Sequence, residues 1–164
     1  MSRMLSIFFG VGLLRPAPGT WASAVAIGLG LLIDRYLGGA PALLAATVLV
    51  TALGFWACAR ELVGRPGADP GEIVIDEVAG QWLALLVPAT AFWWRGHDGF
   101  MPYPGWLAAF VFFRLFDIWK PWLVGRADRR HDPAGVMLDD LWAGLFAGVA
   151  VMAAAGLAHG VLLR

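Results

Sequence analysis

The sequence predicts an all-α protein, a compact multi-helix bundle embedded in a membrane, with about five spans and a short N-terminal interfacial or re-entrant helix. Three observations predict this class. The mean hydropathy of the chain is +0.71, only 15% of its 164 residues are charged, and long apolar runs alternate with segments rich in Gly and Pro. A soluble protein of this size needs more polar surface, whereas membrane-embedded helices need almost none. The length favours one domain over residues 1–164.

The apolar runs define the expected elements in order. The first, Met4 to Leu14, is too short to cross a bilayer and is expected to lie in the interface or to re-enter. Because a hydrocarbon core requires about 20 apolar residues per helix, the longer runs predict spans at Trp21–Leu37, Pro41–Ala59, Val78–Trp94, Trp106–Trp119 and Leu141–Leu163. The fourth span is short and carries two charged residues, so we expect its end to face a protein interior or a wet cavity.

The basic residues give the expected orientation. With the chain starting in the cytoplasm, most of them fall on the cytoplasmic side, as the positive-inside rule requires. Those inside would be Arg3, Arg15, Arg60, Arg65, Lys120, Arg126, Arg129 and Arg130, and those outside Arg35, Arg95 and Arg164. The same topology brings four polar stretches to one face of the membrane, namely Pro18–Thr20, Asp76–Glu77, Asp117–Lys120 and His131–Asp140. This expected convergence is the main functional signal.

Composition argues against several classes of partner and site. The formal net charge is zero, and without a basic run a nucleic-acid partner is not expected. Cys58 is the single cysteine, so the chain has neither an internal disulfide nor a cysteine-rich metal site. The tryptophans, with Trp21, Trp82, Trp119 and Trp122 among them, suit anchoring at the membrane interface.

Two pairs of carboxylates stand in strongly apolar surroundings. Asp76 and Glu77 lie in "IVIDEVAGQW", and Asp139 and Asp140 lie in "GVMLDDLWAG" just before the last predicted span, after an expected turn at Pro133 to Gly135. Capping of a helix start explains one acidic residue of a pair, not both. Together with Asp117 these carboxylates exceed what capping needs, and ligands that offer only oxygen suit a hard cation, Mg²⁺ above all.

Two glycines indicate how the pairs could meet. Gly80 and Gly144 each follow an acidic position by a few residues. Small residues let helix backbones approach closely in lipid. We therefore expect the two acidic helix ends to lie side by side.

A third motif, "FRLFDIWKPW", carries Arg114, Asp117 and Lys120 at every third residue, which places them on one broad side of a helix. They could form a ladder of ion pairs, but charges within a membrane span are functional by default. Arg114 and Lys120 are therefore candidate catalytic residues that hold a phosphate, and Asp117 a candidate metal ligand or a catalytic group that orients water.

Two further residues are candidates for phosphate binding. Thr20 starts the first full span and could meet an anion with its hydroxyl and nearby backbone N–H groups, although a simple helix cap accounts for it equally well. His131 is the only histidine on the expected side of the cluster, and the alternative is an ordinary surface residue.

Four segments, in this order and at these separations, resemble bacterial phosphatidylglycerophosphatase A. They are "PGTWAS" (18–23), "IVIDEVAGQW" (73–82), "FRLFDIWKPW" (113–122) and "GVMLDDLWAG" (135–144), so the resemblance covers nearly the whole chain. It implies an Mg²⁺-dependent phosphatase of the bacterial inner membrane. Such an enzyme hydrolyses phosphatidylglycerophosphate to phosphatidylglycerol and phosphate in phospholipid biosynthesis, with its active site on the cytoplasmic face.

The resemblance also carries residues over by position. The family's acidic residues fall on Asp76, Glu77, Asp117, Asp139 and Asp140, and Arg114 and Lys120 take the neighbouring basic positions. One departure stands out: the chain has His131-Asp132-Pro133 where members often show His-Gly-Gly, which makes this loop stiffer and more acidic.

Other chemistries leave signatures that the sequence lacks. It has no Asp-x-Asp nucleophile pair, no arginine six positions after Cys58 as a cysteine phosphatase needs, and none of the paired Arg-His signatures of metal-independent lipid phosphatases. A metal-activated water is therefore preferred to a covalent intermediate. Two rival functions stay open. One is a phosphatase or phosphotransferase for another membrane lipid phosphate, and the other is a small ion or phosphate transporter, against which the gathering of charge at one face argues.

Overall fold

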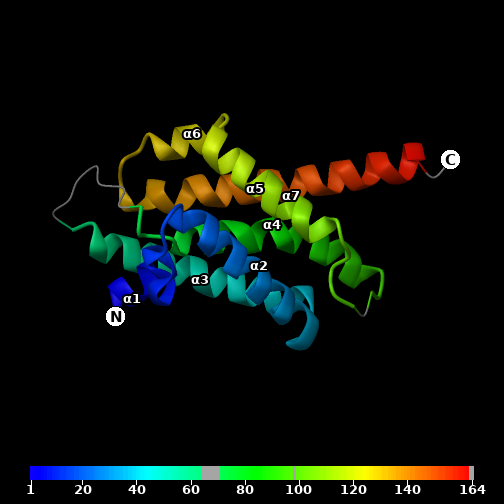
Figure 1. The fold of residues 1–164 in the computed structure, drawn as a ribbon, viewed down its shortest axis with the longest axis horizontal. Coiled ribbons are helices and arrows are strands. Elements are labelled where there is room, and N and C mark those ends of the chain that lie inside the picture. Colours follow the sequence, from blue (N-terminus) through cyan, green and yellow to red (C-terminus); the bar gives the residue numbers. More distant parts are fainter. Residues whose placement is uncertain (64–70, 98, 163–164) are drawn as a thin grey trace.

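The computed structural model describes residues 1–63, 71–97 and 99–162, and within these ranges the chain is helical, without strands (Figure 1). The bundle is built from α2 (Pro18–Tyr36), α3 (Ala40–Glu61), α4 (Ile75–Trp94), α5 (Gly105–Trp119) and α7 (Pro133–Leu162). Shorter elements are α1 (Ser2–Ser6), the 3-10 helix η1 (Phe8–Leu13) and α6 (Leu123–Asp128). The all-α prediction is thus confirmed. Most of the expected connection Gly64 to Gly71, with Arg65, and also Arg164, lie outside the described residues.

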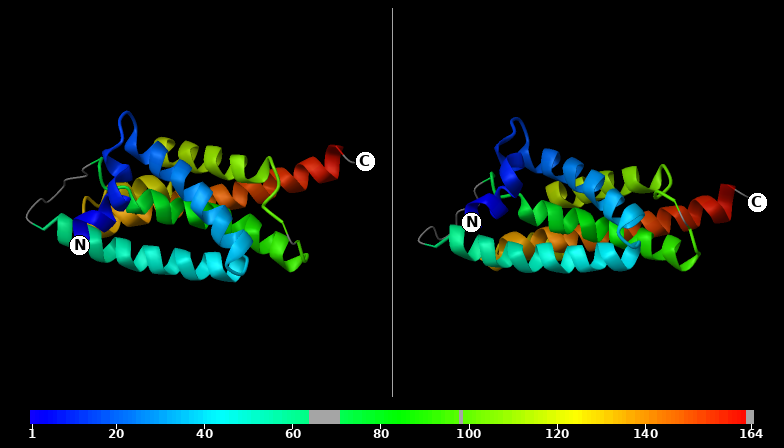
Figure 2. Two further views of the ribbon diagram at one scale, coloured as in Figure 1. Left: turned by 60° about the horizontal axis from the view of Figure 1, so that its bottom comes forward. Right: turned by 90° about the horizontal axis from the view of Figure 1, so that it is seen from below.

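The bundle is elongated, and its two ends are easily told apart. The N-terminus lies near one end of the long axis, while the last turns of α7 extend past the other helices at the opposite end (Figures 1 and 2). The starts of α4 and α7 and the end of α5 lie at the first of these ends (Figure 1). This end therefore gathers the segments that carry the acidic and basic motifs.

Four of the five predicted spans coincide with helices to within a few residues, but α7 begins earlier than predicted. The expected turn at Pro133 to Gly135 is wrong, because α7 starts at Pro133. Pro is favoured in the first turn of a helix, and the Asp132 side chain caps this turn by accepting the Gly135 N–H at 2.6 Å. Asp139 and Asp140 consequently lie about two turns inside α7, so capping does not explain either of them.

Among the described residues, two helices are long and apolar enough to cross a membrane, α3 and residues 133–160 of α7. Their length and composition suit a membrane span, but core helices of soluble proteins can have the same length and composition. The helix that carries the basic motif, α5, has 15 residues and rises only about 22 Å.

The central element is α4, which contacts α2, α3, α5 and α7. Its closest neighbour is α7, and the two backbones touch at a pair of glycines: a Cβ atom on Gly144 would overlap the carbonyl oxygen of Gly80. Against α2, the Trp82 indole donates a hydrogen bond to the Ala26 carbonyl at 2.7 Å. Trp82 is only 7% exposed, so its expected role at the membrane interface is wrong, because this indole joins two helices within the bundle.

The N-terminal segment packs against the residues that lead into α4. The Val74 N–H donates to the Ser6 carbonyl at 2.8 Å, and a Cβ atom on Gly12 would overlap the Glu72 carbonyl. Within η1, Phe9 and Gly10 have positive φ, so this short helix is kinked there. The predicted short N-terminal helix is therefore observed as α1 followed by η1, and it fixes the start of α4.

The glycine contact predicts a contrast between two Gly→Ala substitutions in α7. Gly144→Ala should lower the free energy of unfolding by about 1–3 kcal/mol, because α4 and α7 must move apart. Gly156→Ala should leave it unchanged or raise it by up to about 1 kcal/mol, since nothing lies within 4 Å of the new methyl group. Thermal unfolding in detergent micelles measures both, and equal stability of the two variants would contradict the contact.

Candidate metal centre

The first turn of α4 presents two acidic side chains to the interior. The helix begins at Ile75, directly after Val74 is tied to the N-terminal segment, and the Asp76 carboxylate accepts the Glu77 N–H at 3.0 Å. Asp76 is 6% exposed. The N-terminal end of a helix favours negative charge, but the helix dipole stabilises two buried carboxylates only weakly.

A third carboxylate reaches this point from α7. The contact between Gly80 and Gly144 places α7 against α4, and a Cβ atom on Gly80 would lie 2.5 Å from the Asp140 carbonyl oxygen. As a result Asp76, Glu77 and Asp140 each offer an oxygen within 4.8 Å of the other two. Three of the five predicted metal ligands therefore form one group, which we call the carboxylate trio.

The trio is short of positive charge. Arg114 of α5 is the cation that interacts with both Glu77 and Asp140, but its guanidinium forms an ion pair at 2.6 Å with Asp117. Asp117 in turn repels Glu77 and Asp140. One arginine thus faces four carboxylates, and buried charge without compensation is costly.

Several buried polar atoms around the trio have no hydrogen-bond partner among the described residues. They include Glu77 Oε2, Asp140 Oδ1, the Arg114 Nε and both amide atoms of Gln81. Buried polar groups are normally paired. Two free carboxylate oxygens within one oxygen-only group match the ligands that Mg²⁺ prefers, so the residues present fit a hard divalent cation.

The start of α2 closes the site from another side. Gly19 packs directly on Glu77 and Arg114, so that a Cβ atom here would overlap the Glu77 carboxylate. Thr20 follows it but is exposed, and its backbone N–H is already bonded to the Ala17 carbonyl at 3.0 Å. Of the predicted "PGT" stretch, Gly19 therefore touches the site, whereas Thr20 lies at its outer edge with its hydroxyl as the remaining donor.

Lys120 and Asp139 form a second, separate charged group. The Lys120 ammonium lies 3.0 Å from Asp139 Oδ2 and also forms an ion pair with Asp128 of α6. Burial lowers the pKa of Lys120, but its hydrogen bonds to Asp128 and Asp139 outweigh that effect and raise this pKa above its ordinary value. Asp139 is therefore engaged by Lys120, although its neighbour Asp140 belongs to the trio.

His131, the remaining predicted residue, is exposed with a positive φ of 51°. The loop around it is organised by Asp132, which accepts a hydrogen bond from Arg130 at 2.9 Å and caps α7. The Arg130 guanidinium and the Gly135 N–H lower the pKa of the Asp132 carboxyl. No contact places His131 within the trio.

The comparison with protein families identifies the family of this chain. The family model described as phosphatidylglycerophosphatase A matches residues 4–155. The chain belongs to this family. The family predicted from the four motifs is confirmed, and with it the enzyme class, a phosphatidylglycerophosphatase.

Individual proteins give the same result. A protein named phosphatidylglycerophosphatase A from Haemophilus influenzae is 34% identical over 92% of this chain and 86% of its own length. Its namesake from Escherichia coli is 33% identical over 87% and 76%. A Bacteroides thetaiotaomicron protein named putative phosphatidylinositol-3-phosphatase is 36% identical over 89% and 88%. No solved structure matches the chain.

Sequence reasoning on the phosphatidylglycerophosphatase A motifs missed two residues of the site. Gly19 was passed over in favour of Thr20, although a residue without a side chain beside buried groups is itself a signal of close packing. Asp128 could not be found, because an aspartate within the Arg-rich stretch 126–130 is expected to be a solvated surface residue.

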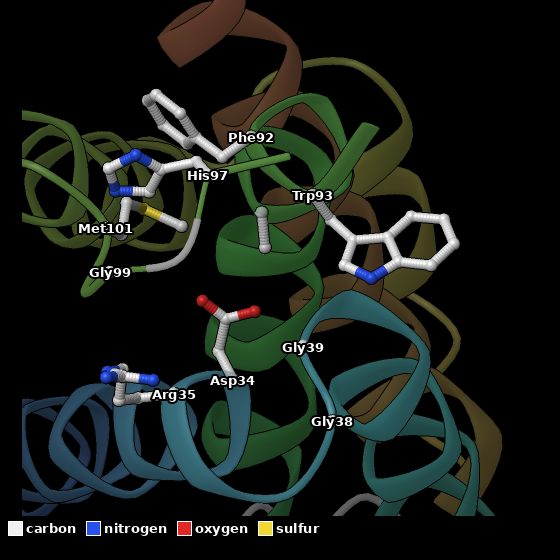
Figure 3. A pocket seen from close by; sticks show the side chains of 10 residues that line it. Asp34, Arg35, Gly38, Gly39, Phe92, Trp93, His97, Gly99 and Met101 are labelled. Carbon is white, nitrogen blue, oxygen red and sulfur yellow. The ribbon is translucent and has the colours of Figure 1, made fainter. Parts of the chain in front are cut away.

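A cavity of about 300 Å³ lies at the other end of α4. Asp34 of α2, the rings of Phe92 and Trp93 at the end of α4, and His97 surround it (Figure 3). The His97 Nε2 lies 3.3 Å from the Phe100 carbonyl. None of the predicted site residues lines this cavity.

The charge shortage predicts an unusual stability effect. In the presence of chelator, Asp140→Asn should raise the free energy of unfolding by about 1 kcal/mol or more, because it removes repulsion from Asp76, Glu77 and Asp117. Asp132→Ala is the control and should lower the free energy of unfolding by about 1 kcal/mol, since it removes the side chain that caps α7. Chemical unfolding followed by circular dichroism measures both, and a destabilised Asp140→Asn protein would contradict the reading of the trio.

In the group formed by Lys120, Asp128 and Asp139, loss of Lys120 should destabilise the protein more than loss of the Asp128 charge. Lys120→Met should cost about 3 kcal/mol, because it leaves Asp139, whose side chain is 11% exposed, buried without a partner. Asp128→Asn should cost less than about 1 kcal/mol, since this pair is more exposed. If the same unfolding assay gave equal losses, Asp139 would not depend on Lys120.

Proposed function

We propose that the chain hydrolyses phosphatidylglycerophosphate to phosphatidylglycerol and phosphate, in an Mg²⁺-dependent reaction at the cytoplasmic face of the bacterial inner membrane. The observation that carries the proposal is the carboxylate trio, buried beside Arg114 with two unpaired oxygens, in a member of the phosphatidylglycerophosphatase A family. Residues 1–164 would act as one domain of this kind.

The surface of the bundle supports membrane embedding by about five helices. Large apolar side chains are exposed along the outer faces of α2, α3, α5 and α7, whereas the central α4 exposes such side chains at its end, Trp93 and Trp94. Examples on the other helices are Leu32, Val48, Leu49, Val111, Ile118, Val149 and Leu157. Water does not tolerate so much exposed apolar surface on one small protein, whereas lipid does. Five crossings from a cytoplasmic N-terminus would place the trio at the inner leaflet.

Asp76, Glu77 and Asp140 would hold the Mg²⁺ ion, which supplies charge neutralisation at the phosphate oxygens and lowers the pKa of a water molecule. Arg114 lies beside the trio and would bind a phosphate oxygen with the guanidinium N–H groups that Asp117 does not use. Lys120 and Asp139 would border the entrance to the metal site. There the substrate phosphate would compete with Asp128 for the Lys120 ammonium. Thr20 and His131, both exposed, would contact the substrate from the rim.

The reaction requires one proton transfer between oxygens. A water oxygen forms a bond to phosphorus, the bond from phosphorus to the glycerol oxygen breaks, and that oxygen leaves with a proton. Asp117 would orient the water and accept its proton, because it is the carboxylate of α5 that interacts electrostatically with Glu77 and Asp140. Its ion pair with Arg114 fixes the direction of the carboxylate.

Substitution of the acidic residues tests this function. Asp76→Asn, Asp117→Asn and Asp140→Asn should each reduce phosphate release from phosphatidylglycerophosphate at least about 100-fold, whereas Asp34→Asn, at the far end of the bundle, should keep wild-type turnover. Near-normal turnover in all three variants would remove the proposed centre.

The choice of metal and substrate can be tested with the same purified protein in mixed micelles. Chelation should stop phosphate release, and added Mg²⁺ should restore it. Phosphatidylinositol 3-phosphate serves as the competing substrate, and faster release from it than from phosphatidylglycerophosphate would reject the proposed substrate.

A further inference from the structure

Gln81 of α4 is a neutral polar side chain buried inside the bundle. It is 0% exposed, and it is the only glutamine of a chain that has no asparagine. Neither its amide nitrogen nor its amide oxygen has a hydrogen-bond partner among the described residues. A buried amide without partners destabilises a fold, and an apolar side chain of similar size would avoid that cost. The position of Gln81 therefore indicates a ligand that its amide binds.

The unpaired atoms of Gln81 belong to a larger group at the metal centre. The other buried side chains that are polar but uncharged each donate a hydrogen bond to a carbonyl of their own helix, three or four residues earlier; they are Ser6, Ser23 and Thr47. In the part of the chain that the structure describes, the buried side-chain atoms without a partner come from Glu77, Gln81, Arg114 and Asp140. Three of these four residues form or adjoin the carboxylate trio, which indicates that Gln81 serves the same site.

The geometry of α4 directs Gln81 toward the trio. Residues four positions apart lie on one face of a helix, and helical side chains lean toward the N-terminal end. Gln81 therefore leans toward Glu77, whose Oε2 is also buried and unpaired. One turn further along the same face, Leu85 is fully buried and offers no polar group. Along this face of α4, the free oxygen of Glu77 is thus the unpaired acceptor nearest to the Gln81 amide.

We propose that Gln81 is a positioning residue of the metal centre: its amide N–H donates to a water molecule, and this water donates to Glu77 Oε2. The inference rests on the proposed function, because a cation must occupy the trio. Outer hydrogen bonds of this kind orient a carboxylate toward its metal ion, and buried water is found where several polar groups meet. The neutral amide adds no charge, so Gln81 fixes the direction of Glu77 and leaves neutralisation to the cation.

Substitution by methionine tests this role through metal binding. Gln81→Met keeps the length of the side chain but removes both hydrogen-bonding groups, and it should weaken Mn²⁺ binding in micelles, measured by electron paramagnetic resonance, about tenfold or more. Leu85→Met, one turn further along α4, is the matched control and should bind Mn²⁺ like the wild type. A merely structural Gln81 would lower the midpoint of thermal unfolding in chelator and leave Mn²⁺ affinity at the wild-type value. That result, or an equal loss of affinity in both variants, would overturn the proposal.

A second measurement uses the wild-type protein and does not depend on how a variant folds. Because Gln81 is the only side-chain amide of the chain, ¹⁵N-labelled protein in micelles should give one amide NH₂ pair in its nuclear magnetic resonance spectrum. This pair should show a nuclear Overhauser effect to bound water, and it should shift when Mg²⁺ replaces chelator. Absence of either effect would overturn the proposal. Protein that shows both effects but releases no phosphate from phosphatidylglycerophosphate would refute the proposed function alone.

Discussion

The structure depends on the direct contact between the backbones of α4 and α7 at Gly80 and Gly144. A side chain at either position would separate the helices, and the acidic residues one turn before each glycine would then no longer face one another. Close approach of helices therefore brings together three carboxylates that lie far apart in the sequence. The N-terminal segment supports the same arrangement, because its hydrogen bond to Val74 fixes where α4 begins.

This contact creates an electrostatic problem that the protein alone does not solve. The cations of the region are divided between two groups: Arg114 is paired with Asp117, and Lys120 with Asp128 and Asp139. Neither group neutralises the trio, where free oxygens stay buried. In an apolar bundle such a shortage of positive charge is tolerated when a bound cation neutralises the carboxylates. A metal ion would do so, and it would also bind the phosphate of the substrate. The proposed metal and phosphate site completes this unbalanced group of charges.

The sequence predicted much of the fold, because long apolar runs and their breaks depend on local composition. The start of α7 was wrong since Pro133 and Gly135 suit a turn as well as a first helical turn, and only the cap by Asp132 decides between them. Neighbouring Asp139 and Asp140 were assigned one role, but their side chains point about 100° apart on a helix and meet different partners. The link from Lys120 to Asp128 depends on how α6 folds back, which no local pattern records.

Binding of Mn²⁺, a paramagnetic substitute for Mg²⁺, tests most directly whether the carboxylate trio forms one site. Electron paramagnetic resonance of the purified protein in micelles gives the affinity and the number of bound ions. We expect Asp76→Asn, Glu77→Gln and Asp140→Asn each to weaken the same tight site by about tenfold or more, and Asp128→Asn to leave it unchanged. Wild-type affinity in any two of the three variants would contradict a shared site.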